Sequence, residues 1–193
     1  MAVAREEIDK LIGGRAAHVD GTSAAAVGRP PAAKLWLRGC AAQRVTANDP
    51  ATLLVTDFSR EQAWTVTEER SIDDALRDMV CAGIGALLVV RSDAVTGLVT
   101  SYDIQGRRSL EFLQSSRLAS RGEIQVGHVM TPWGRVPVLD WRSVSVSRVR
   151  HVEEWARNTR ATHALLVEQL EGIEYVRGLL SRAHVERSLG CSL

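Results

Sequence analysis

Hydrophobic residues in the middle of this chain follow the order strand, helix, strand, strand, helix. Residues 64–66 alternate like a short strand, and the apolar residues from Ile72 onward have helical spacing. Ser71 and Asp74 have the spacing of a capping box before this helix, and Gly83 is placed to end it. The expected apolar face of the helix comprises Ile72, Ala75, Leu76, Met79 and Val80.

The next segment predicts a hairpin followed by a second helix. Residues 86–90 are continuously apolar, which is typical of a buried strand, and residues 95–100 predict the returning strand after a polar turn. Residues 101 to about 113 predict the helix. Thr100 and Asp103 stand at its start, where a hydroxyl and free backbone N–H groups also suit a phosphate. The same spacing is that of a capping box, which needs no ligand.

A similar pattern returns after a polar connector at residues 114–126. Residues 164–167 repeat the buried strand, and residues 175–180 repeat the next one. Aligning Ala86 with Ala164 gives an offset of 78 residues, and aligning Gly97 with Gly178 gives an offset of 81. The second hairpin loop is therefore expected to be three residues longer than the first.

This duplication predicts an α/β (α+β) fold with three parts. Residues 1–48 cannot bury much surface and are expected to form a flexible N-terminal arm. Residues 57–126 form the first repeat with its connector, and residues 127–190 form the second. Because one repeat of this size holds little core, we expect the two to pack around a pseudo-twofold axis.

Composition and motifs exclude several classes of function. The chain of 193 residues has 24 basic and 23 acidic side chains, which gives no field to attract nucleic acid or a membrane surface. Its longest uncharged apolar run, residues 79–90, is too short to span a bilayer. The three cysteines and five histidines lack metal-ligand spacing, and no nucleotide-loop or hydrolase motif occurs. We therefore expect a cytoplasmic protein that is not an enzyme and holds no metal.

The two strand-to-helix corners and residues 129–132 carry a resemblance to a known family. Residues 97–103 (Gly-Leu-Val-Thr-Ser-Tyr-Asp) are echoed by residues 178–184, and both lie in the order just described. The chain resembles a tandem cystathionine-β-synthase-type (CBS) domain pair, or Bateman module, over residues 57–190. The resemblance implies β-α-β-β-α repeats that often dimerise again, and a sensor of AMP, ADP, ATP or S-adenosylmethionine bound in clefts between repeats.

The resemblance also implies which residues touch the ligand. The Thr100 hydroxyl would approach a phosphate, Asp103 would hold the ribose hydroxyls, and Ser101 lies between them. In the second corner Ser181 keeps the hydroxyl, whereas His184 replaces the carboxylate and cannot accept bonds from two ribose hydroxyls. His184 is therefore more simply explained as a partly exposed helix residue. A further departure is leucine where the family often has proline before its buried strand, at Leu88 and Leu166.

Two functions follow from these observations. The first is a stand-alone regulatory module that requires no cofactor, binds an adenine nucleotide or adenosyl ligand, forms a homodimer and signals to an unknown effector protein. The second is a ligand-free dimerisation or scaffold protein in which both corners are purely structural. The departures at Leu88, Leu166 and His184 favour the second.

Overall fold

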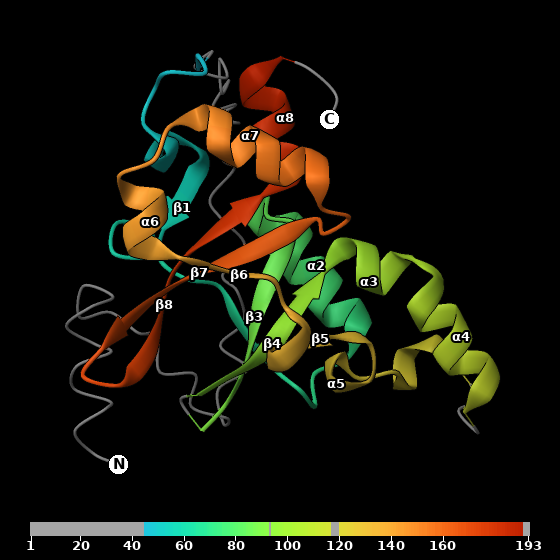
Figure 1. Ribbon diagram of the computed structural model, residues 1–193. Helices are drawn as coiled ribbons and strands as arrows, with labels where there is room; N and C mark the ends of the chain where they lie inside the picture. Colours follow the sequence, from blue (N-terminus) through green and yellow to red (C-terminus); the bar gives the residue numbers. More distant parts are fainter. Residues whose placement is uncertain (1–44, 93, 117–119, 191–193) are drawn as a thin grey trace, which may run out of the picture. The chain divides into compact units, whose positions relative to one another are not determined.

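The computed structural model describes residues 45–92, 94–116 and 120–190, which divide into two compact units (Figure 1). One unit comprises residues 63–137. The other joins the segment before residue 63 to the segment from residue 138 onward. The predicted arm, residues 1–48, lies outside the described residues except for its last four positions.

Each unit contains one four-stranded sheet with the same topology. The first sheet has the order β2 (Thr65–Thr67), β3 (Ala86–Arg91), β4 (Ala94–Thr100) and β5 (Thr131–Pro132). In it β2 runs parallel to β3, and the other two pairs are antiparallel. The second sheet has the order β6 (Val138–Asp140), β7 (His163–Leu170), β8 (Ile173–Ser181) and β1 (Val55–Asp57), again with one parallel and two antiparallel pairs. The predicted duplication is confirmed.

Helices complete each unit. The first contains α2 (Ile72–Ala82), α3 (Ser101–Gln105), α4 (Arg107–Ser115), η2 (Arg121–Glu123), α5 (Val126–Val129) and η3 (Trp133–Arg135). The second contains η1 (Ala51–Leu54), α6 (Trp141–Ser145), α7 (Val149–Asn158) and α8 (Arg182–Leu189). In the first unit, buried side chains of α2, α3 and α5 form one core with the inward residues of β2, β3 and β4.

The capping signals of α2 act as predicted, but its apolar face is narrower. The Ser71 hydroxyl accepts the N–H of Asp74 at 3.1 Å, and Gly83 ends the helix with a φ of 68° in the left-handed region. Met79 is 1% exposed, whereas Val80 is 72% exposed, so the prediction that Val80 belongs to the core is wrong. The core contacts only the side of α2 that carries Ile72 and Met79.

The helix predicted from residue 101 to about 113 is two helices. Gly106 separates α3 from α4 with an extended conformation (φ −89°, ψ −163°). A Cβ at this position would lie 2.3 Å from the Tyr102 carbonyl oxygen, so the break depends on glycine. Ser109 stabilises the break because its hydroxyl donates to the carbonyl oxygens of Ile104 (2.7 Å) and Gly106 (3.1 Å).

Each sheet receives an edge strand from the segment that precedes the other repeat. Residues 129–132 were expected to begin the second repeat, but β5 pairs with β4 of the first sheet. The segment before the first repeat supplies β1, which pairs with β8 of the second sheet. Both edges depend on glycine: a Cβ would lie 2.5 Å from the Thr131 carbonyl oxygen at Gly97, and 2.6 Å from the Thr56 carbonyl oxygen at Gly178.

Strand register corrects the alignment of the two repeats by one residue. Ala86 lies opposite Thr100 in the first hairpin, and His163 lies opposite Ser181 in the second. His163, not Ala164, is therefore equivalent to Ala86, so the offset is 77 and the second hairpin is four residues longer than the first. The prediction of a longer loop is wrong, because the extra residues lie in the strands: β7 and β8 have 8 and 9 residues, whereas β3 and β4 have 6 and 7. The direction of the side chains agrees with this register. Leu87 and Val89 face the core of the first unit, and their equivalents Ala164 and Leu166 face the core of the second.

The corrected register also changes the leucine comparison. Leu88 and Leu165 are equivalent, because they lie opposite Leu98 and Leu179 in their hairpins. Leu166 was paired with Leu88 in the sequence alignment but occupies the neighbouring position, on the opposite face of its strand. The two leucines singled out from the sequence are therefore not counterparts.

Candidate functional site

The first corner is the junction between β4 and α3, where Thr100 is the N-cap residue. Its hydroxyl accepts the backbone N–H of Asp103 at 3.2 Å and donates to Asp103 Oδ2 at 2.7 Å. The same Oδ2 accepts the backbone N–H of Thr100 at 3.0 Å. Thr100 is 5% exposed, so leaving these polar groups unpaired would be costly. The capping box predicted from the spacing is formed.

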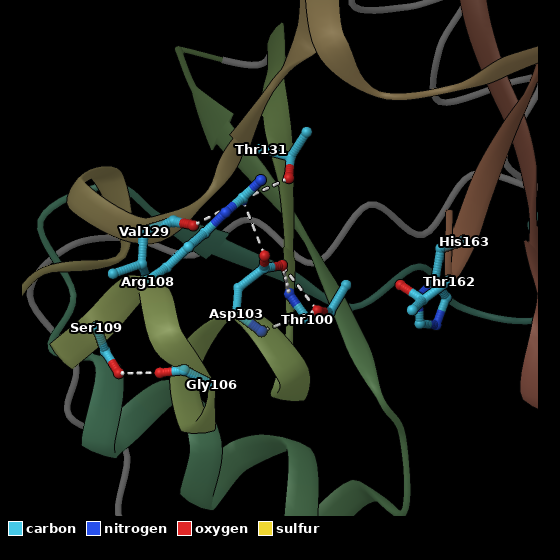
Figure 2. Close-up of polar contacts among 9 residues, drawn as sticks. All are labelled: Thr100, Asp103, Gly106, Arg108, Ser109, Val129, Thr131, Thr162 and His163. Carbon is cyan, nitrogen blue, oxygen red and sulfur yellow. Dashed lines mark hydrogen bonds and ion pairs between the residues drawn. The ribbon is translucent and has the colours of Figure 1, made fainter. Parts of the chain in front are cut away.

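Arg108 binds the second carboxylate oxygen of Asp103 (Figure 2). Its Nη1 donates to Asp103 Oδ1 at 2.8 Å, to Thr131 Oγ1 at 2.8 Å and, more weakly, to the Val129 carbonyl oxygen at 3.3 Å. The Asp103 side chain is only 14% exposed, whereas that of Arg108 is 51% exposed. One guanidinium nitrogen thus joins the corner to the end of α5 and to β5.

Ser101 is the first residue of α3, and its backbone N–H is also occupied. It donates to the Gly85 carbonyl oxygen at 3.0 Å, while the Asp103 N–H is taken by the cap. The corner therefore has fewer free backbone donors than the spacing alone predicts for a phosphate site. Thr100, Ser101 and Asp103 lie together in the first unit, as predicted.

The second corner, between β8 and α8, has the same backbone path with different side-chain chemistry. Ser181 is the N-cap residue, but its hydroxyl caps no helix N–H. The Arg182 N–H donates to the Thr162 carbonyl oxygen at 2.9 Å, which matches the bond from Ser101 in the first unit. His184 is exposed and lies at the position of Asp103. This corner therefore lacks the buried carboxylate and the cap of the first.

Within residues 45–92, 94–116 and 120–190, no group of three or more His, Cys, Asp or Glu side chains is arranged to hold a metal ion. None of the helices in those segments is long and apolar enough to cross a bilayer.

No protein-family model matches the chain, and no curated protein matches it either. Solved structures do match. A CBS-domain protein from Burkholderia ambifaria MC40-6, described as a signal-transduction protein, is 27% identical, with a TM-score of 0.50 over 68% of this chain and 85% of that one. CBSX2 of Arabidopsis thaliana in complex with AMP is 23% identical, with a TM-score of 0.51 over 73% and 96% of the two chains. This chain has the fold of a tandem CBS domain pair.

A third match supports the same fold. A conserved protein from Pyrococcus horikoshii is 18% identical, with a TM-score of 0.52 over 77% of this chain and 98% of that one. The β-α-β-β-α order expected from the sequence is confirmed in both units.

Arg108 and Thr131 complete the first corner, and the sequence placed neither there: Arg108 was one of several helical arginines that could meet a phosphate, and Thr131 was not singled out as a site residue. Arg108 lies in a helix where arginines usually face solvent, and Thr131 lies in a segment assigned to the other repeat. The sequence feature that could have placed Arg108 at the corner is Gly106, because a helix break at this glycine changes the direction of the residues that follow it. No signal for Thr131 exists without the knowledge that β5 pairs with β4.

Proposed function

We propose that this CBS pair is a regulatory module, not an enzyme, that binds an adenine nucleotide or adenosyl ligand at its first corner and signals to an effector protein as a homodimer. The observation that carries the proposal is the half-exposed Arg108 bound to the largely buried Asp103. It brings a cation, a carboxylate and two hydroxyls together on one corner. Those groups can bind a phosphate and a ribose diol.

The comparison with CBSX2 supports the choice of ligand class. That protein has the same fold and binds AMP. In this chain Asp103 Oδ1 is the carboxylate oxygen outside the cap, and its partner is the half-exposed Arg108. A ribose hydroxyl would donate to Oδ1 while Oδ2 continues to hold the N-terminus of α3. The corner would then bind ligand without unfolding its cap.

Titration calorimetry with AMP, ADP, ATP and S-adenosylmethionine tests the proposal. We expect at least one of them to bind the wild-type protein, and Asp103→Asn to weaken that binding by about tenfold or more, which corresponds to about 1.4 kcal/mol. Glu111→Gln is the matched control, because Glu111 pairs with Arg107 instead. Absence of heat for all four ligands would refute the proposal.

The second candidate function is a ligand-free dimerisation or scaffold protein. It is favoured by the bonds that satisfy Thr100 and Asp103 without any ligand. This candidate predicts that Asp103→Asn lowers the stability of the fold and that purified protein carries no nucleotide. Mass spectrometry of denatured, freshly purified protein distinguishes the two, since an adenine nucleotide at stoichiometric amount would exclude the scaffold function.

A further inference from the structure

Arg108 reaches Asp103 only because the helix is broken between them. On a continuous α-helix, a residue five positions further on is rotated by roughly 140° about the axis. Arg108 would then lie on a different face from Asp103. The extended conformation of Gly106 turns α4 so that the second residue of this helix points back to the corner.

The guanidinium of Arg108 has donors that the protein does not use. Arginine carries five N–H donors, and all three bonds of Arg108 come from Nη1. The N–H groups on Nε and Nη2 have no acceptor among the residues that the structure describes. Because Asp103 and Thr131 fix the position of Nη1, these remaining donors are held in place on a half-exposed side chain.

Four other donors at the corner are already engaged. The hydroxyl of Thr100 and the backbone N–H groups of Thr100, Ser101 and Asp103 all have acceptors within the first unit. An anion would have to break those bonds to use them. Arg108 is the one cationic side chain that the described residues show bound to this carboxylate, and it can accept an anion without losing a bond.

We propose that Arg108 recognises the phosphate of the nucleotide that the proposed function places at Asp103. This inference rests on that proposed function. It names Arg108 as the residue that distinguishes a nucleotide from its nucleoside, because the two ligands differ by the phosphate. Fork-shaped contact of a guanidinium with a phosphate is strong and directional. The second corner lacks this guanidinium group. Leu189 occupies the position equivalent to Arg108, and it packs against the core of its own unit.

The test compares AMP with adenosine by titration calorimetry on four proteins. These are the wild type, Arg108→Gln, Arg108→Lys and the control Arg107→Ala, whose arginine is 89% exposed in its side chain and pairs with Glu111. We expect AMP to bind the wild type about 10- to 100-fold more tightly than adenosine, and Arg108→Gln to reduce this ratio to near one. Arg108→Lys keeps the charge without the fork and should give an intermediate ratio.

Thermal unfolding of each variant checks that the fold is retained, and Thr131→Val provides a second route. It removes one anchor of Nη1 but keeps the guanidinium, so we expect a smaller loss of AMP affinity than for Arg108→Gln. An unchanged ratio of AMP to adenosine affinity in Arg108→Gln would overturn the inference and leave the proposed function standing. Equal affinities in the wild type would do the same. Failure of both ligands and of ADP, ATP and S-adenosylmethionine to bind the wild type would overturn both.

Discussion

Asp57 lies opposite Gly178 in the pairing of β1 with β8. Pro132 lies opposite Gly97 in the same way in the first sheet. In both cases the edge strand comes from outside the repeat that it completes, and its carbonyl oxygen lies where a side chain of the central strand would begin. Gly97 and Gly178 are therefore matched positions at which to test how closely each edge strand pairs with its neighbour.

Replacing either glycine with alanine should destabilise its own unit. A Cβ at Gly97 or Gly178 would come within 2.6 Å of a backbone oxygen, so the edge strand must shift, at a cost of about 1–3 kcal/mol. Urea unfolding measures the loss. Gly134→Ala is the control, because a Cβ there meets nothing within 4 Å. Equal stability of Gly97→Ala and Gly134→Ala would contradict the close approach.

Leu54 and Leu53 test whether the segment before the first repeat belongs to the second unit. Leu54 is 1% exposed in the second core, whereas Leu53 is 47% exposed. We expect Leu54→Ala to cost about 2–5 kcal/mol and Leu53→Ala much less. Hydrogen exchange should show the loss of protection in β7 and β8. Loss confined to β3 and β4 would show that the segment packs elsewhere.

Neighbouring residues of α2 test the orientation of this helix. Met79→Ala should destabilise the first unit by about 2–5 kcal/mol, because the side chain is 1% exposed in the core. Val80→Ala should change the free energy of unfolding by no more than about 0.5 kcal/mol, because Val80 is 72% exposed. Denaturant titration gives both values. A larger effect at Val80 would restore the wider apolar face that the sequence predicts.

Thr100 allows the cap to be measured apart from any ligand. Thr100→Val keeps the shape but removes the acceptor of the Asp103 N–H, so we expect a loss of about 0.5–2 kcal/mol in ligand-free protein. Thr100→Ser keeps the hydroxyl and should retain most of that stability. Full stability of Thr100→Val together with destabilisation of Thr100→Ser would mean that the methyl group, and not the hydroxyl, matters at this corner.

Asp140 gives a prediction for pH. The pKa of its carboxyl group is lowered from the ordinary value of 3.8, mainly because the carboxylate accepts bonds from the hydroxyl and backbone N–H of Ser143. The contribution of these bonds to stability is therefore present above pH 3.8 and is lost as the pH falls through the lower pKa of the folded state. NMR titration should place the Asp140 midpoint below 3.8 in the wild type and nearer to it in Ser143→Ala. An unchanged midpoint would show that another group sets this pKa.

Local patterns in the sequence predicted what depends on local physics. The cap at Ser71, the helix end at Gly83 and the box at Thr100 follow from hydrogen bonds between near neighbours. Relations between distant segments were not predicted. The position of β5 depends on its pairing with β4, and the contact of Arg108 with Asp103 depends on the break at Gly106; the spacing of apolar residues encodes neither. The one-residue error in alignment arose because both strands are apolar on both faces, so hydrophobicity does not fix their register.

The pairing of β1 with β8 has a consequence for the order in which the protein folds during synthesis. All four strands of the first sheet lie between residues 65 and 132, so it can form while the ribosome is still making the rest of the chain. The second sheet uses one strand made before the first sheet and three made after it. Its earliest strand, β1, cannot pair until β8 has been made, more than a hundred residues later, and such long-range closure is intrinsically slow. The second sheet is therefore expected to form after the first.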